Sequence, residues 1–437
     1  MITARASTWP GRCLAWGLAF LANAPASAEV SIAGADVSHL EFFEERGVVY
    51  RDEQGVRDAL AILSGQGLNC ARLRLFTSSA EQAGADPYNA INNLDYTVPL
   101  AVRVKNAGMR FLLDIHYSDS WADPGKQDKP VEWVALAFPE LEERVFEYSR
   151  GVTEAFRKAG AAPDYVQVGN EVTGGLLWPD GRVGGSYDTA GQWSQLGRLL
   201  KSAIRGLKEG AGDSPPDIMI HIDRGADWGT TRWFFDRLMQ EQVAFDLIGQ
   251  SYYPFWHGSL NDVRTCLNQG AVRYGKPVWI VETAFPWSGS VDVAGISPSP
   301  AGQVEYVLEL ARTLRGVPGG KGMGIVWWGA EYVRLGGYSL AGFDRRSFFD
   351  FEGCVLPVAG VLGQLTWPVR LDLERSSTGL ALTWPASGVG MVLTTTSTAS
   401  LPRAWTTVDT VPVWDGVMFR ASLPYTDPFG LFRLESQ

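Results

Sequence analysis

Two glutamates stand out because each one closes an otherwise apolar run that is typical of a buried strand. Glu171 ends the segment DYVQVGNE, and Glu282 ends the segment PVWIVE. A carboxylate in such a place is costly unless it is paired or useful. A single one is often a structural residue with satisfied hydrogen bonds, whereas two of them favour chemistry. Paired carboxyl groups suit the hydrolysis of an acetal, in which one donates a proton to the leaving oxygen and the other attacks or stabilises the oxocarbenium-like centre.

Polar and aromatic residues at other strand ends fit the same chemistry. Asn170 is placed to hold a sugar hydroxyl or to orient the acid, and Tyr253 to donate a hydrogen bond that keeps Glu282 ionised. A tryptophan face either stacks on a flat ligand or packs in a core. The tryptophans expected at the rim are Trp121, Trp178, Trp256, Trp287 and Trp328.

These residues need a scaffold of parallel strands, and the alternation of β-rich runs with amphipathic segments predicts one. Strands are expected over residues 30–38, 69–76, 109–117, 164–171, 218–223, 245–253, 277–284 and 324–328. Helices are expected over residues 54–64, 94–106, 141–158, 192–208, 230–240 and 303–315. Eight strand–helix units predict an α/β fold, a (β/α)8 TIM barrel, with its working residues at the C-terminal ends of the strands. A doubly wound sheet is the alternative, but the turn after the first strand lacks a GxGxxG motif.

The two ends of the chain differ from this central part. Residues 1–28 have the pattern of a signal peptide. The positive charges of Arg5 and Arg12 come first, a short apolar run follows, and Ala26-Ser27-Ala28 provides a cleavage site of small residues. We therefore expect a secreted or periplasmic protein. The catalytic barrel is expected over residues 29–365. Residues 366–437 contain only short alternating runs and predict a small all-β, sandwich-like C-terminal module, either a structural cap or a weak glycan binder.

Composition excludes several classes of protein. The 437 residues carry 48 acidic and 38 basic side chains, a net charge of −10, which argues against binding of nucleic acid. No run beyond the leader is long and apolar enough for a membrane span, so no membrane partner is expected. The four histidines (His39, His116, His221 and His257) are scattered, which argues against a metal-dependent hydrolase. We expect Cys70, Cys266 and Cys354 to be thiols in the core. A single disulfide bond between two of them is the alternative.

Several stretches of the chain resemble a known family of enzymes. They are GADVS at 34–38, GLNCARLR at 67–74, HYSDSWADPGKQ at 116–127, PDYVQVGNE at 163–171, LWP at 177–179, SYYPFWHG at 251–258 and VET at 281–283. Over residues 33–365 the chain resembles glycoside hydrolase family 53, the arabinogalactan endo-β-1,4-galactanases of the clan A (β/α)8 barrels. The resemblance implies an endo-acting, retaining hydrolase of the β-1,4-galactan in type I arabinogalactan, and hence a part in pectin degradation.

The resemblance also implies roles for individual residues. Glu171 corresponds to the acid/base and Glu282 to the nucleophile, while Arg72 matches an arginine that helps to keep the nucleophile ionised. The residues expected to bind the sugar are Arg72, His116, Asp119, Trp121, Asn170, Trp178, Tyr253 and Trp328.

The chain departs from the family pattern at two places. Gly329-Ala330-Glu331 follows Trp328 where the family usually has Glu-Pro. The loop over residues 287–300 has a single aspartate, Asp292, and lacks the D-x-N-x-H-x-N pattern with which bacterial members bind calcium. We therefore expect no metal and no cofactor, and a monomer whose partner is the polysaccharide.

Two other functions remain open at this stage. Another clan A β-1,4-glycanase, such as a mannanase or a glucanase, would use the same strand ends with different loops. A non-catalytic glycan-binding barrel would keep the cleft without turnover, and the presence of both Glu171 and Glu282 argues against it.

Overall fold

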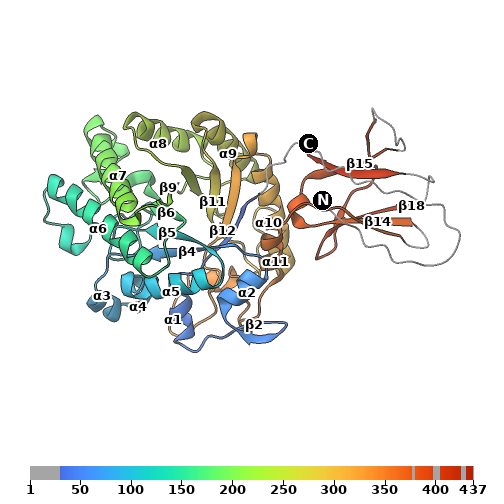
Figure 1. Ribbon diagram of the computed structural model, residues 1–437, viewed down its shortest axis with the longest axis horizontal. Coiled ribbons are helices and arrows are strands. Elements are labelled where there is room, and N and C mark those ends of the chain that lie inside the picture. The colour runs from blue at the N-terminus through green and yellow to red at the C-terminus, as the bar shows by residue number, and fades with distance from the viewer. Residues whose placement is uncertain (1–29, 376–378, 397–403, 425–429, 437) are drawn as a thin grey trace. The chain divides into compact units, whose positions relative to one another are not determined.

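Eight parallel strands form the centre of the larger of two compact units (Figure 1). The computed structural model describes residues 30–375, 379–396, 404–424 and 430–436. The strands close into a barrel in the order β1-β12-β11-β10-β9-β6-β5-β4. Their bounds are Ile32–Asp36 (β1), Cys70–Leu75 (β4), Arg110–Ile115 (β5), Tyr165–Val168 (β6), Asp217–Ile222 (β9), Leu247–Ser251 (β10), Val278–Thr283 (β11) and Gly322–Trp327 (β12). The predicted TIM barrel is confirmed.

Helices surround the strands, and most of the longer ones begin at a polar residue that caps them. The caps whose side chains accept a backbone N–H are Asp58, Ser79, Asp86, Asn93, Thr189, Asp227, Ser259 and Ser299. The helices are Leu40–Glu44 (α1), Ala59–Gly65 (α2), Ala80–Ala85 (α3), Pro87–Ala90 (α4), Leu94–Asn106 (α5), Phe138–Lys158 (α6), Ala190–Ala211 (α7), Trp228–Gln240 (α8), Leu260–Tyr274 (α9), Pro300–Arg315 (α10) and Pro357–Gln364 (α11).

The helix predicted over residues 54–64 is wrong in its first half. Tyr50–Asp52 (β2) and Gly55–Arg57 (β3) pair as a hairpin there, and α2 begins only after them. Gly55 has φ +104°, a conformation that glycine adopts at little cost and that is incompatible with a helix. A second hairpin joins Gly175–Leu176 (β7) to Gly181–Arg182 (β8) in the loop after β6.

The inside of the barrel is divided into an apolar layer and a polar layer. Ile32, Leu112, Trp279 and Val326 belong to the buried apolar cluster. One step nearer the C-terminal ends of the strands, successive inward positions carry polar side chains, which are equally buried: Arg72, Asp114, Gln167 and His221. The polar layer is therefore the floor of whatever site lies at the mouth of the barrel.

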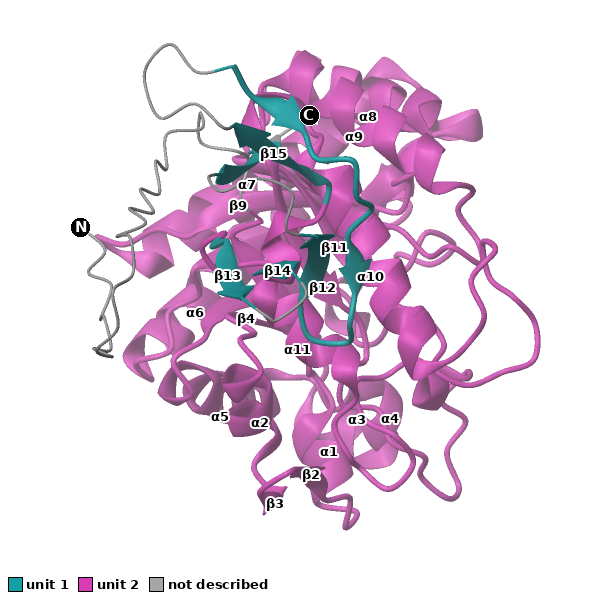
Figure 2. Cartoon of the chain, turned by 90° about the vertical axis from the view of Figure 1, so that its right-hand side faces the viewer, with its two compact units in different colours: residues 1–26, 370–384, 390–437 teal, residues 27–369, 385–389 magenta. Residues whose placement is uncertain are grey.

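The C-terminal residues form a separate compact unit (Figure 2). It consists of residues 370–384 and 390–437, whereas residues 385–389 belong to the barrel unit. Its sheets are antiparallel, in the orders β13-β14-β18-β17 and β16-β15-β19. The strands are Asp372–Arg375 (β13), Gly379–Trp384 (β14), Met391–Thr396 (β15), Thr406–Thr407 (β16), Val413–Trp414 (β17), Phe419–Pro424 (β18) and Leu431–Ser436 (β19). The all-β character predicted for this region is confirmed.

Three further expectations concern single features of the chain. The segment predicted to be a signal peptide lies outside the described residues. Within the described ranges, Cys70, Cys266 and Cys354 are free thiols. No helix in those ranges combines the length and the apolar character that crossing a membrane requires.

Candidate active site

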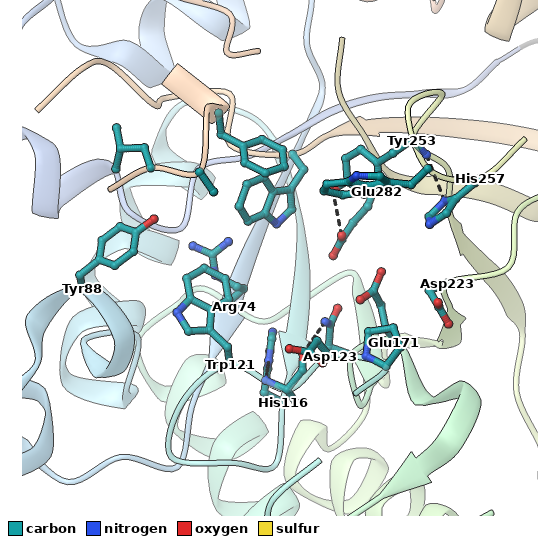
Figure 3. Close-up of a pocket in the computed structure, with 18 residues that line it drawn as sticks. Arg74, Tyr88, His116, Trp121, Asp123, Glu171, Asp223, Tyr253, His257 and Glu282 are labelled. Atoms are coloured by element: carbon teal, nitrogen blue, oxygen red, sulfur yellow. Dashed lines mark hydrogen bonds between the residues drawn. The ribbon is translucent and has the colours of Figure 1, made fainter. Parts of the chain in front are cut away.

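A cavity opens at the C-terminal ends of the barrel strands, and both predicted glutamates line it (Figure 3). Their carboxyl groups point into the same space from opposite sides, Glu282 from β11 and Glu171 from the loop after β6. Glu282 is only 6% exposed, so water reaches its carboxylate from the cavity alone. The arrangement places the two groups where a bound acetal would meet both.

A tight turn after β6 aims Glu171 at the cavity. Gly169 has φ +87°, and a Cβ atom there would lie 2.4 Å from Cγ1 of Val172. Glu171 itself has φ +48°, in the left-handed region that non-glycine residues rarely occupy. Strained backbone of this kind is concentrated at functional sites, where the surrounding structure holds it.

A local irregularity of β11 aims Glu282 in the same way. Val281 belongs to the apolar cluster inside the barrel, so regular alternation would turn the next residue outward. The pairing of β11 with β12 shifts register between Ile280 and Thr283. Such a bulge re-aims a side chain, which explains why Glu282 lies at the mouth directly after an inward-facing neighbour.

Arg72 on β4 is the cation that holds Glu282. Its Nη2 lies 2.7 Å from Oε1 of Glu282 and 2.8 Å from Oδ2 of Asp114, while Nη1 lies 2.7 Å from Oδ2 of Asp36. All of these side chains are buried, so the ion pairs are weakly screened by water. Burial alone would raise the pKa of Asp114, but Arg72 and then His116 lower it to about 2. One guanidinium thus forms ion pairs with three carboxylates, and a second buried cation, Arg74, lies 3.4 Å from Asp36.

The two catalytic candidates differ in the pKa that their surroundings impose. The pKa of Glu282 is raised by burial, and the charges of Asp114 and Asp36 add to the rise, whereas Arg72 at one oxygen and the Tyr253 hydroxyl, which donates across 3.1 Å to the other, oppose it. Burial raises the pKa of Glu171 well above its usual value, and the charges of Glu282 and Asp223 add to the effect. Glu171 is therefore the carboxyl group that keeps its proton, and Glu282 the one that ionises first.

Other predicted residues also line the cavity. Hydrogen bonds fix the side chains of three of them, Asn170, His116 and Trp121. The Asn170 amide accepts from Arg72 across 2.9 Å and donates to the Ala122 carbonyl across 2.8 Å. Nδ1 of His116 accepts the N–H of Ala122, which leaves Nε2 to face Asp114 at 2.9 Å. Trp121 donates to Asn89, and Trp328 completes the same wall, 6.2 Å away between ring centroids.

Three predicted sugar-binding residues do not line this cavity, and each has a structural reason. Arg72 lies beneath the cavity floor, so it positions Glu282 instead of meeting a ligand. Asp119 accepts from Thr77 across 2.6 Å, and from Gln82 and the Val131 amide across 2.9 Å each, and so ties loops together. Trp178 donates to the Gly174 carbonyl and carries the Arg182 guanidinium 4.2 Å from its ring centroid.

Several cavity residues were not identified from the sequence. Arg74 lies under Trp121, with its guanidinium carbon 4.2 Å from the ring centroid, and Asp223 lies beside Glu171 (Figure 3). The other unforeseen lining residues include Tyr88, Asp123, His257 and Phe343. Arg74 follows Arg72 by two positions and Asp223 follows His221 by two. The two-residue period of a strand was thus a usable signal for both.

The departure after Trp328 places a carboxyl group behind the cavity wall. Glu331 is fully buried, and its Oε1 accepts the N–H of His39 across 2.8 Å. Burial and the charge of Asp36 raise its pKa to about 8, against the opposing effect of Arg74. Glu331 is not part of the cavity lining, so its protonation bears on the fold and not on a bound ligand.

A metal is not needed to explain any of these side chains. Among the described residues there is no group of three or more histidines, cysteines or carboxylates placed to hold an ion. The buried carboxylates Asp36, Asp114 and Glu282 each form an ion pair with Arg72.

A TIM barrel with two opposed glutamates of different pKa and an aromatic wall defines a glycoside hydrolase. The chain belongs to glycosyl hydrolase family 53, which it matches over residues 32–362. It is 42% identical over 344 residues to a Niallia circulans protein described only as uncharacterized, covering 74% of this chain and 91% of that protein. It is 35% identical to a probable arabinogalactan endo-β-1,4-galactanase A of Neosartorya fischeri, covering 72% of this chain and 88% of that one.

Solved structures agree with this assignment. The catalytic domain of a family 53 protein from Ignisphaera aggregans superposes with a TM-score of 0.70 at 32% identity, covering 81% of this chain and all of that one. A fungal β-1,4-galactanase superposes with a TM-score of 0.68 at 30% identity, covering 76% of this chain and 99% of that one.

Proposed function

We propose that this protein is an exported, endo-acting galactanase that cleaves β-1,4-galactan with retention of configuration at the anomeric carbon. The observation that carries the proposal is the contrast between the two glutamates. Arg72 and Tyr253 favour the ionised form of Glu282, which suits a nucleophile, whereas burial and neighbouring negative charge raise the pKa of Glu171 well above its usual value and favour its protonated form, which suits an acid.

The reaction takes place in two steps on these two groups. First, a carboxylate oxygen of Glu282 attacks the anomeric carbon, the bond to the leaving oxygen breaks, and Glu171 gives its proton to that oxygen. This produces a covalent glycosyl–enzyme. In the second step Glu171, now ionised, takes a proton from water, the water oxygen attacks the anomeric carbon, and Glu282 is released as a carboxylate.

The choice of galactan rests on the relatives. A Humicola insolens protein that is 34% identical to this chain is described as an arabinogalactan endo-β-1,4-galactanase, and the Neosartorya fischeri protein is described as a probable one. The aromatic side chains of the cavity, Tyr88, Trp121, Trp256 and Trp328, offer flat faces of the kind that pack against the apolar side of a galactose ring. Such a substrate is uncharged, which is compatible with the acidic balance of the chain.

Export and the monomeric state belong to the same proposal. The leader pattern over residues 1–28 supports transport out of the cytoplasm, to the place where a pectic polysaccharide would be met. N-terminal sequencing of protein recovered from the periplasm or medium is expected to start near Glu29, and light scattering is expected to give the mass of one chain. A cytoplasmic protein with an intact leader would contradict the export.

The decisive experiment is a product profile on linear β-1,4-galactan, followed by proton NMR of the first products. We expect short galacto-oligosaccharides whose new reducing ends appear first as the β-anomer. Glu171→Ala and Glu282→Ala should each remove activity, whereas Glu305→Gln on the exposed side of α10 should not. Release of the α-anomer would overturn retention, and turnover of mannan or a cellulose derivative in place of galactan would overturn the substrate.

A further inference from the structure

Buried hydrogen bonds connect Arg72, which holds Glu282, to Glu171 on the other side of the cavity. Arg72 Nε lies 2.7 Å from Oε1 of Gln167, whose Nε2 lies 2.8 Å from Nδ1 of His221. Nε2 of His221 lies 2.8 Å from Oγ of Ser251, which in turn lies 2.6 Å from Oε1 of Glu171. Gln167, His221 and Ser251 are completely buried on β6, β9 and β10, and the reaction described above gives them no part.

Arg72 determines the direction of the first half of this chain of hydrogen bonds. A guanidinium group only donates, so the oxygen of the Gln167 amide must face Arg72 and the nitrogen must face His221. That nitrogen donates, and Nδ1 of His221 therefore accepts. The backbone N–H of Glu171 also points at Nδ1, at 3.4 Å, which requires the same unprotonated nitrogen.

The second half follows from the tautomer of His221. With Nδ1 accepting, a neutral ring carries its proton on Nε2 and donates to Ser251. Burial and then the charge of Arg72 lower the pKa of His221 well below its usual value, so the ring stays neutral. Ser251 has a single hydroxyl proton and already accepts from His221, so it donates to Oε1 of Glu171.

We propose that Gln167, His221 and Ser251 are positioning residues that keep Oε1 of Glu171 as a permanent acceptor and reserve Oε2 for the catalytic proton. The inference rests on the proposed function, because it deepens the role of Glu171 in that reaction. In each hydrogen bond of this chain the donor lies on the Arg72 side and the acceptor on the Glu171 side. The chain begins at Arg72, whose guanidinium does not release its proton. Glu171 therefore exchanges its proton only with the contents of the cavity and never with the protein interior.

The pH dependence follows from the groups that face Glu171. The charges of Glu282 on β11 and Asp223 after β9 add to burial in raising its pKa, while the Ser251 hydroxyl and Arg72 on β4 lower it. The other titratable neighbours, Tyr253 and His221, are uncharged because burial raises the pKa of Tyr253 and lowers that of His221. Loss of the Ser251 hydroxyl should thus raise the pKa of Glu171 and move the alkaline limb of the rate profile to higher pH.

The first test measures the direction of the hydrogen bonds without any substrate. Nitrogen-15 NMR of the histidine rings, with His221 assigned by comparison with His221→Gln, should show an unprotonated Nδ1 and a protonated Nε2 from about pH 5 to 8. A proton on Nδ1, or a doubly protonated ring in this range, would overturn the proposal.

The second test removes the last donor. Ser251→Ala should shift the alkaline limb of kcat/KM upward by about one unit. It should also slow galactan hydrolysis about tenfold, yet barely affect a 2,4-dinitrophenyl galactobioside, whose leaving group needs no acid. Ser251→Thr keeps the hydroxyl and should restore most of the rate of galactan hydrolysis and most of the native pH profile. Ser149→Ala on α6 removes an equally buried hydroxyl elsewhere and should leave the pH profile unchanged.

Two outcomes separate this inference from the proposed function. The positioning role would be refuted if Ser251→Ala lost the same fraction of its rate on galactan and on the dinitrophenyl substrate. It would also be refuted if the variant had the native melting temperature and the native pH profile. In both cases the galactanase activity would stand. If the native protein does not act on galactan, the proposed function fails, and the His221 tautomer still decides the direction of the hydrogen bonds.

Discussion

The two carboxyl groups of the cavity are held by opposite means. Glu282 meets a full positive charge, because the buried Arg72 lies 2.7 Å from one oxygen and the Tyr253 hydroxyl donates to the other. Glu171 is held by the neutral Ser251 hydroxyl, with like charges nearby. A cation stabilises an ionised group strongly, whereas a neutral donor fixes geometry and stabilises the charge much less. The difference shows how one cavity can give two carboxyl groups different pKa values.

The largest effect is expected when the cation is removed. Arg72→Met would take the shared cation away from Asp36, Asp114 and Glu282 and leave Asp36 only its longer contact with Arg74, so the free energy of unfolding at neutral pH should fall by about 3–5 kcal/mol. The remaining folded protein should lose about 100- to 1,000-fold in kcat, because Glu282 would then be protonated. Calorimetry and galactan hydrolysis measure the two losses.

The control for this variant is an arginine in an exposed ion-pair network. Arg103 on α5 bridges Glu44 and Asp58 and is 30% exposed. Arg103→Met should cost at most about 1 kcal/mol and leave kcat unchanged. Similar losses in both variants would mean that the charge of Arg72 has no special relation to Glu282.

A smaller effect is expected when only the neutral donor to Glu282 is removed. Tyr253→Phe takes away the hydroxyl at 3.1 Å from Oε2, so the pKa of Glu282 should rise and kcat should fall about 10- to 100-fold. The acid limb of the rate profile reports the ionisation of Glu282 and should move to higher pH. Tyr274→Phe, at the end of α9, is the matched control and should leave that limb in place, and movement of the alkaline limb alone would contradict the assignment.

The smallest effect concerns a third buried carboxyl group, which lies outside the cavity. In the folded protein the pKa of Glu331 is raised to about 8, above its value in the unfolded chain. The protonated carboxyl group therefore makes its full contribution to stability in acid, and this contribution is lost as the pH rises toward 8. Glutamine does not ionise, so Glu331→Gln should remove this pH-dependent loss of stability. The variant should match the native protein near pH 5 and be more stable by roughly 1–3 kcal/mol near pH 8 in urea unfolding. A constant difference at both pH values would contradict the raised pKa.

The barrel and its two glutamates were predictable because their signals are local. Glu171 and Glu282 each close an apolar run, and eight such runs alternate with helical patterns. The sequence predicts a helix from residue 54, whereas residues 50–52 and 55–57 pair as a hairpin, because this local pairing is not visible in the pattern of polar and apolar residues.

The details of the site depend on contacts between distant parts of the chain. Gln167, His221 and Ser251 look in the sequence like ordinary polar interruptions of strands, and only the closed barrel joins them into one chain of hydrogen bonds. Asp119 and Trp178 lie in loops, whose path the periodicity of strands does not determine, and neither of them lines the cavity.

The division of roles between the two glutamates is tested most directly by their own titrations. Carbon-13 NMR of glutamate carboxyl groups, assigned with Glu171→Gln and Glu282→Gln, would follow both sites in the free native protein. We expect the first deprotonation of the pair to appear at Glu282, and the second, at higher pH, at Glu171. Deprotonation in the reverse order would contradict the account.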